Sequence, residues 1–128
     1  MIKKWRFVVC SLLALLLLTG CGNKVDDTTS KTYISKAEEV VQWINESEFE
    51  KVAAQFDEKM AANLTVEQLN EITPIITASG QFEKIEKQSV EEKDGNKIVV
   101  LVAKYSEENR IYTVTYDAED QIAGLFVQ

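Results

Sequence analysis

Hydrophobic side chains recur at helical spacing soon after the start of the chain's second quarter. Five apolar residues fall at i, i+4, i+7, i+8 and i+11, with charged and amide side chains between them: Tyr33, Ala37, Val40, Val41 and Ile44. This spacing predicts an amphipathic helix that begins at Thr32.

A second helix is predicted from Ser47 onward, where apolar residues again keep to one face. Ser47 stands three residues before Glu50, which is the spacing of a capping box. Four apolar residues beyond Phe49 continue the stripe: Val52, Ala53, Phe56 and Met60. We therefore expect one helix over residues 47–60.

A third helix is predicted to start at Thr65, which precedes Gln68 by the same three residues. Its apolar stripe runs toward Gly80, a residue suited to a C-terminal cap. Pro74 lies inside the stripe and is expected to kink the helix or to end it at Thr73, because proline lacks the backbone N–H that a helix interior needs.

The last third of the chain has the pattern of β-strands. Runs rich in β-branched and aromatic residues occupy residues 98–103, 111–116 and 122–127, and residues 82–92 complete a meander of four strands with a less regular alternation. Turns are predicted at Asp94-Gly95, Glu107–Asn109 and Asp117–Asp120. Helices followed by an antiparallel meander predict an α+β fold.

The predicted strand over residues 98–105 is apolar on both faces. One face carries Val99, Leu101, Ala103 and Tyr105, and the other carries Ile98, Val100, Val102 and Lys104. Three helices cover only one face of a four-stranded sheet, so the other face, or a gap under the helices, needs an occupant. The candidate pocket or interface residues are Val100, Val102, Tyr105, Tyr112, Tyr116 and Phe126.

The composition argues against most familiar catalytic sites. The chain has no His, which removes the commonest general base, the usual zinc ligand and the histidine-paired nucleophiles. The acidic turn of Asp117, Glu119 and Asp120 lacks the spacing of a calcium loop, and the three tyrosines are explained by packing. We therefore expect no enzyme activity, no metal and no cofactor.

The first 20 residues have the composition of a signal peptide. Three cations precede a twelve-residue apolar run, which is shorter than the roughly 20 residues that span a bilayer. The following Leu18, Thr19, Gly20 and Cys21 resemble the lipobox of bacterial lipoproteins, which implies cleavage before Cys21 and lipid on its thiol. The alternatives are an ordinary secretory signal and a short membrane anchor with an incidental cysteine.

Removal of residues 1–20 would leave 11 cations against 21 anions, a net charge of −10. Such a body is repelled by nucleic acid and by anionic headgroups, so we expect no nucleic-acid partner. Residues 21–31 are predicted to form the lipidated cysteine and a flexible tether, and residues 32–128 a single α+β domain. The predicted location is the extracytoplasmic face of the bacterial membrane.

Several short motifs resemble an uncharacterised domain of small Gram-positive lipoproteins. They are Phe56-Asp57, Lys59-Met60, Leu64-Thr65, Gln68-Leu69, Gly80 with Phe82, and Ile122-Ala123-Gly124-Leu125. That family is placed in the nuclear transport factor 2-like (cystatin-like) fold group. The resemblance implies helices packed on a curved four-stranded antiparallel sheet, a tendency to form pockets and dimers, and no known chemistry.

Two functions remain open. The first is a non-catalytic binding module that uses the apolar sheet face for self-association or for an envelope protein partner. The alternative is a carrier or sensor of a small apolar ligand held between helices and sheet.

Overall fold

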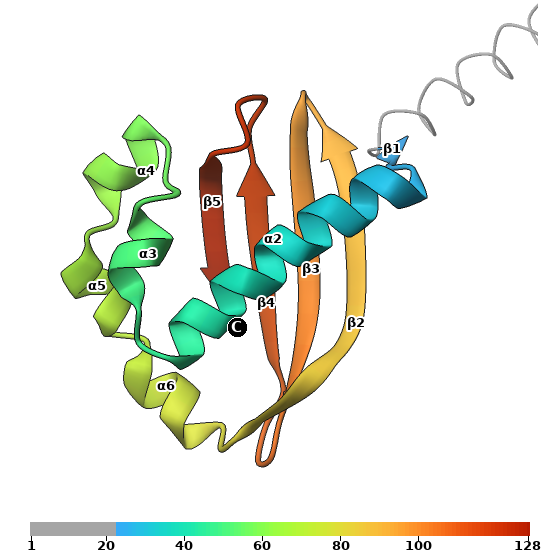
Figure 1. Cartoon of the computed structure of the whole chain (residues 1–128). Coiled ribbons are helices and arrows are strands. Elements are labelled where there is room, and N and C mark those ends of the chain that lie inside the picture. Colours follow the sequence, from blue (N-terminus) through green and yellow to red (C-terminus); the bar gives the residue numbers. More distant parts are fainter. Residues whose placement is uncertain (1–22) are drawn as a thin grey trace, which may run out of the picture.

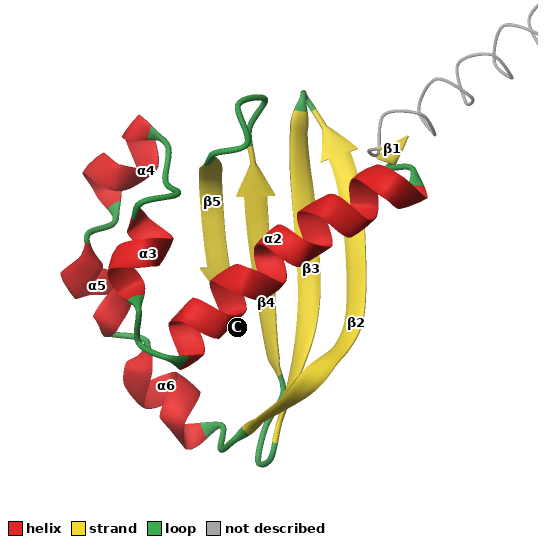
Figure 2. Cartoon of the chain, viewed as in Figure 1, coloured by secondary structure: helices red, strands yellow, loops and turns green. Residues whose placement is uncertain are grey.

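The computed structural model describes residues 23–128 (Figures 1 and 2). The predicted signal peptide and lipobox, including Cys21, lie outside these residues. The elements in chain order are β1 (Asn23–Lys24), α2 (Asp27–Asn45), α3 (Phe49–Ala53), α4 (Glu58–Asn63), α5 (Val66–Asn70), α6 (Thr73–Ala78), β2 (Phe82–Lys93), β3 (Asn96–Tyr105), β4 (Arg110–Tyr116) and β5 (Ile122–Val127). None of the helices in this part of the chain combines the length and apolarity needed to cross a bilayer.

An antiparallel sheet forms one layer of the domain, with its strands in the order β1-β2-β3-β4-β5. The four long strands confirm the predicted meander, and the two residues of β1 pair with Glu91 and Glu92 at the edge of β2. Helix α2 crosses the sheet diagonally, and the short helices lie at the β5 end of the molecule (Figure 1). The predicted α+β class is confirmed.

Helix α2 begins five residues before the predicted start. The carboxylate of Asp26 accepts a hydrogen bond from the backbone N–H of Thr29 at 2.7 Å, which caps the first turn. The predicted flexible tether is therefore wrong from Asp27 to Lys31, which are helical. The polar residues of this first turn carry no apolar periodicity, and the cap residue alone marks the boundary.

Ser47 caps the C-terminal end of α2 instead of starting the next helix. Its φ is 60°, its N–H bonds to the carbonyl of Ile44 at 3.1 Å, and the N–H of Glu48 bonds to the carbonyl of Trp43 at 2.8 Å. These two bonds make a Schellman motif, in which a left-handed residue satisfies the last carbonyls of a helix. The predicted capping box at Ser47 is wrong because this residue already serves the preceding helix.

The predicted helix over residues 47–60 is two helices, α3 and α4, with a break around Phe56. At the break, the N–H of Ile122 bonds to the carbonyl of Gln55 at 2.7 Å, and the N–H of Asp57 bonds to the carbonyl of Ile122 at 2.9 Å. The backbone that leaves the helix thus pairs with the start of β5. The Asp57 carboxylate then caps α4 by accepting from the N–H of Met60 at 2.8 Å.

The predicted ends of the third helix are confirmed, but two short helices, α5 and α6, stand in its place. Thr65 and Gln68 form the reciprocal capping box at the start of α5. The prediction that Pro74 kinks the helix or ends it at Thr73 is wrong: α5 already ends at Asn70, and Thr73 begins α6. Pro74 lies in the first turn of α6, where its missing N–H has no helical partner to lose. Gly80 follows α6 with a φ of 90°, as expected for a C-terminal glycine.

The strand turns also agree with the predictions. Asp94 and Gly95 have φ values of 53° and 82°, as a two-residue type I′ turn requires. Strand β2 contains two register shifts against β3, between Phe82 and Lys84 and between Ile85 and Lys87. Each shift moves the following side chains to the opposite face, which explains the irregular alternation over residues 82–92.

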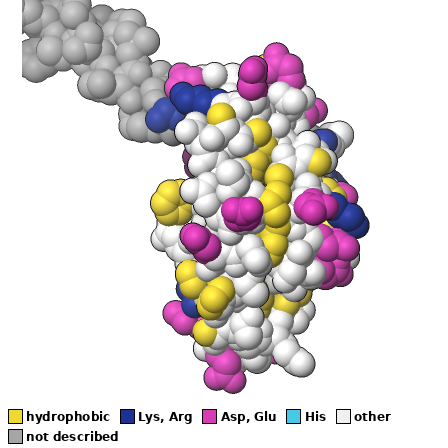
Figure 3. Space-filling view, turned by 90° about the vertical axis from the view of Figure 1, so that its left-hand side faces the viewer, with side chains coloured by type: hydrophobic (Ala, Val, Ile, Leu, Met, Phe, Trp, Pro, Cys, Tyr) yellow, Lys and Arg dark blue, Asp and Glu magenta, His cyan; other side chains and the backbone are white. Residues whose placement is uncertain are grey.

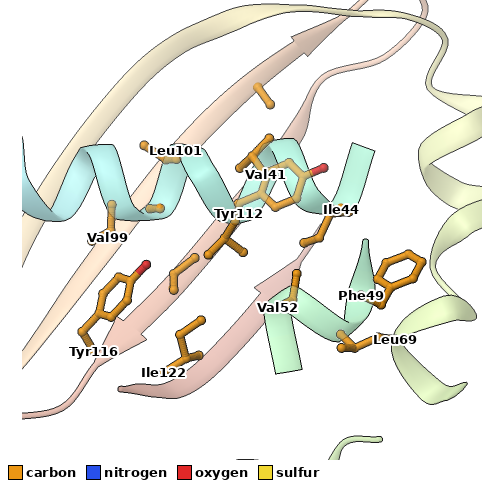
Figure 4. Packing of buried hydrophobic residues seen from close by; sticks show 14 of the residues in the cluster. Val41, Ile44, Phe49, Val52, Leu69, Val99, Leu101, Tyr112, Tyr116 and Ile122 are labelled. Atoms are coloured by element: carbon orange, nitrogen blue, oxygen red, sulfur yellow. The ribbon is translucent and has the colours of Figure 1, made fainter. Parts of the chain in front are cut away.

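The hydrophobic core lies between α2, the short helices and one face of the sheet (Figure 4). Tyr112, Leu101 and Ile122 from the sheet meet Val41 and Val52 from the helices, and all five are essentially inaccessible to solvent. Side chains therefore fill the layer between helices and sheet.

Candidate functional site

The sheet face opposite the helices carries several large apolar side chains. Across the paired strands, Val100 of β3 lies between Ser89 of β2 and Thr113 of β4. Phe126 of β5 is the next residue in this row, beside Thr113. In the next row, Val102 lies between Lys87 and Ile111. The register thus brings the predicted residues Val100, Val102 and Phe126 together, and it adds Ile98 and Ile111. We call these five residues the open face.

Solvent reaches the open face directly. Phe126 is 64% exposed and Ile111 is 38% exposed, while the side chains of Val100 and Val102 are covered only in part. Among the described elements, α2 packs on the opposite face, where Val99, Leu101 and Ala103 are completely buried. Adjacent large apolar side chains without a covering layer are the mark of an interaction surface.

The three candidate tyrosines do not belong to this face. Tyr105, Tyr112 and Tyr116 point to the helix side and are at most 3% exposed. The six candidate pocket or interface residues therefore lie in two regions, because the alternation of β3, β4 and β5 divides them between the two faces of the sheet.

Two of these tyrosines form a hydrogen-bonded chain that ends at Asn45. The hydroxyl oxygens of Tyr112 and Tyr105 are 2.5 Å apart, and the Tyr105 hydroxyl donates to Oδ1 of Asn45 at 2.5 Å. Because Tyr105 has a single hydroxyl proton, the proton between the tyrosines belongs to Tyr112. Burial raises the pKa of both tyrosines, so both hydroxyls stay neutral.

Near these hydroxyls, Arg110 connects the beginning of β4 to the end of α6. Its Nε donates to Oγ of the buried Ser79 at 2.6 Å, and that hydroxyl donates to the carbonyl of Ile75 at 2.8 Å. A second nitrogen of Arg110 pairs with Glu108 at 3.0 Å. These contacts join β4 to the segment that follows α6, near the hydroxyls of Tyr105 and Tyr112.

Tyr116 lies apart from the other two, at the opposite end of the buried layer. Its hydroxyl has no hydrogen-bond partner within the described residues, and burial raises its pKa. Its ring packs against Tyr33 with 5.5 Å between centroids, and Tyr33 donates to the carboxylate of Asp120. That hydrogen bond is the main reason that the pKa of Tyr33 rises to about 12.

A groove of about 700 Å³ opens beside Tyr105, between the C-terminal ends of α2 and α6 and the start of β2. Its polar lining consists of Asn45, Thr77, Gln81, Tyr105 and Ser106, and Phe82 forms an aromatic wall. Phe82 is 42% exposed and contacts the Tyr105 ring edge-on.

The acidic turn is closed by its own hydrogen bonds. Oδ1 of Asp117 accepts from the N–H groups of Glu119 and Gln121 at 2.9 and 3.0 Å. Over residues 23–128, no three acidic, His or Cys side chains are grouped so that they could hold a metal ion.

Sequence reasoning gave neither Asn45 nor Arg110 a role in a site. Each is a polar residue at the end of an element, and no local pattern distinguishes it from a solvated residue. The strand pattern already placed Ile98 on the face of Val100 and Val102, and Ile111 could have been added because it alternates with buried neighbours along β4.

The structure defines a class of small α+β domain in which helices cover one face of an antiparallel sheet and leave an apolar surface on the other. The chain belongs to the family described as a protein of unknown function, DUF3887, whose model matches residues 37–125. This confirms the resemblance to an uncharacterised domain; the lipoprotein assignment and the nuclear transport factor 2-like fold group stay predictions.

The chain is also similar to a protein from Ruminococcus gnavus ATCC 29149 whose structure was determined by NMR. The TM-score is 0.66 at 23% sequence identity, and the match covers 80% of this chain and 90% of the other. This likeness concerns the fold alone. No curated protein matches the chain.

Proposed function

We propose that this domain is a non-catalytic binding module whose open face packs against the same face of a second copy. The observation that carries the proposal is the uncovered row of Val100 and Phe126 beside that of Val102 and Ile111. Two such faces pack at the spacing of a β-sandwich and remove their apolar side chains from water.

The charges beside the open face favour a second copy as the occupant. Lys87 and Glu91 lie on the same face of β2, one on each side of Ser89. A twofold axis along the row of Ser89 and Val100 places Lys87 of each copy opposite Glu91 of the other. The face is thus self-complementary, as a twofold interface requires.

The test measures the mass of the purified protein over a range of concentrations, by native mass spectrometry and sedimentation. We expect a dimer that is lost in the Val100→Glu and Val102→Glu variants, because each places a carboxylate in the apolar interface. Gln88→Glu is the matched control, because Gln88 is exposed on β2 but pairs with Leu101 on the helix side.

A charge exchange tests the arrangement within the dimer. Lys87→Glu alone should weaken association, and Lys87→Glu combined with Glu91→Lys should restore it. Self-association is refuted if the natural chain is monomeric at every concentration, or if folded Val102→Glu protein dimerises as the natural chain does.

The carrier alternative receives no support from the interior of the described domain. The layer between α2 and the sheet is filled by core residues that are 0–8% exposed. A ligand of any size would have to displace these side chains.

We propose further that the domain is held at the outer face of the membrane by lipid on Cys21. Support comes from the lipobox pattern of Leu18 to Cys21. Two acyl chains give stable anchoring where one is marginal. Cells grown with labelled palmitate should incorporate label into the protein, and Cys21→Ala should abolish the label and release the protein from membranes. Labelling that survives Cys21→Ala would refute the anchor.

A further inference from the structure

The groove beside Tyr105 has no charged residue in its lining. Its walls are made of amide, hydroxyl, aromatic and aliphatic side chains. Asn45 and Phe82 also border a neighbouring groove of about 710 Å³ whose lining includes Glu38, Glu39, Glu46, Glu48 and Lys51, so the uncharged part is the groove beside Tyr105 and Ser106. An uncharged polar groove with an aromatic wall suits a neutral ligand that carries hydrogen-bonding groups.

Asn45 lines this groove and has unused hydrogen-bond donors. The proton of Tyr112 goes to Tyr105 and the proton of Tyr105 goes to Oδ1 of Asn45, so the amide oxygen is already used. The two N–H groups on Nδ2 of Asn45 enter no other hydrogen bond among the described side chains, and Asn45 lines the groove. The chain of hydroxyls thus orients the amide with its donors free for an acceptor such as a carbonyl oxygen.

Phe82 supplies a flat apolar surface next to these donors. Its ring lies edge-on to Tyr105, with 5.5 Å between centroids and an interplanar angle of 68°. One side of the ring is thereby supported while 42% of the residue stays exposed. The negative face of an aromatic ring attracts weakly polarised C–H groups, which line the face of a sugar ring.

Gly80 lets the groove close at its lower end. A Cβ at this position would lie 2.0 Å from Oγ of Ser106, so glycine allows the end of α6 to approach the end of β3 without displacing this hydroxyl. Oγ of Ser106 in turn accepts from the N–H of Gln81 at 2.9 Å. This hydrogen bond joins the residue before β2 to the residue after β3 in the lining of the groove.

From these features we infer that the groove binds a neutral saccharide that carries an acetamido group. The Asn45 amide donates to the acetamido carbonyl, the sugar ring stacks on Phe82, and the hydroxyl of Thr77 and the amide of Gln81 reach the sugar hydroxyls. The site is independent of the proposed dimer, because Phe82 pairs with Tyr105 on the helix side of the sheet and Phe126 belongs to the open face.

The experiment is an NMR titration of the ¹⁵N-labelled full chain with triacetylchitotriose, a neutral trisaccharide with three acetamido groups. We expect saturable shifts at residues of the groove with a dissociation constant of about 1 mM or below. Asn45→Asp should weaken binding about tenfold, because it retains an acceptor for Tyr105 and replaces the donors by a carboxylate. Phe82→Ala should weaken binding to a similar degree, and Phe126→Ala should leave it unchanged.

Each other result overturns the proposal. No saturable shift up to about 10 mM trisaccharide excludes the saccharide. Undiminished binding by Asn45→Asp, the variant that keeps the Tyr105 hydrogen bond, excludes the assigned donors. Equal binding of triglycine, which offers amide carbonyls without a sugar ring, shows that the groove takes peptides instead. Loss of binding in Phe126→Ala places the ligand on the open face.

Discussion

The replacement of Gly80 by alanine tests how the end of α6 meets the end of β3. Gly80 has a φ of 90°, in the left-handed region that disfavours residues with a Cβ. The new methyl group would also lie 2.0 Å from Oγ of Ser106 and 3.1 Å from the backbone nitrogen of Glu107. Gly95 has a similar φ of 82°, and a Cβ there would meet no atom within 4 Å. Alanine at either position therefore adopts a strained φ, but only alanine at position 80 also collides with Ser106.

The backbone strain amounts to about 1 kcal/mol at each position. At Gly80, Ser106 must also move, which breaks its 2.9 Å hydrogen bond to Gln81 at a cost of about 1 kcal/mol and disturbs nearby packing. We expect Gly80→Ala to lower the free energy of unfolding by roughly 2–4 kcal/mol and Gly95→Ala by roughly 1 kcal/mol. At about 4 °C per kcal/mol, the melting temperatures fall by roughly 12 °C and 4 °C.

The assay is urea denaturation followed by far-ultraviolet circular dichroism, with both variants and the natural chain at one protein concentration. Ser106→Ala should recover part of the loss in the Gly80→Ala background, because it removes the hydroxyl that collides with the new methyl group. Equal losses for Gly80→Ala and Gly95→Ala, or no coupling between Gly80→Ala and Ser106→Ala, would refute the contact as the cause.

Two more predictions concern the faces of the sheet and the Tyr33 hydroxyl. Leu101→Ala should lower the free energy of unfolding by about 3 kcal/mol, and Val102→Ala by about 1 kcal/mol or less, because only Leu101 faces the core; equal losses in denaturation curves would contradict the assignment. Phenolate absorbance should show Tyr33 titrating near pH 12, and Asp120→Asn should lower that pKa toward 10. Because the folded-state pKa of Tyr33 is raised, the stability from this hydrogen bond is complete below pH 10 and is lost as the pH rises through 12. An unchanged Tyr33 titration in Asp120→Asn would contradict the role of this hydrogen bond.

The features that were predicted correctly depend on neighbours in the sequence. The capping box of Thr65 and Gln68 spans three residues, and the Asp94-Gly95 turn joins two adjacent strands. The errors at the start of α2 and at Ser47 concern local caps, whereas the break within the predicted second helix has a long-range cause. The helix break near Phe56 comes from backbone pairing with Ile122, far along the chain, which no local pattern contains.

The candidate sites divide in the same way. The alternation of Val100 and Val102 with buried neighbours is visible in the sequence, so the apolar surface could be predicted. The groove could not, because the hydrogen bond that orients Asn45 comes from Tyr105, 60 residues away.

The sequence by itself determined that β3 has two apolar faces, because side chains alternate along any strand. Only the tertiary structure decided which face α2 covers. Both faces are apolar enough to receive a helix, so burial of apolar side chains alone does not choose between them. The face with Leu101 and Tyr105 is selected by contacts from distant elements, including the bond from Tyr105 to Asn45 and the pairing of Ile122 with the α3–α4 break. Those contacts hold α2 and the short helices on one side and leave Val100, Val102 and Phe126 open on the other.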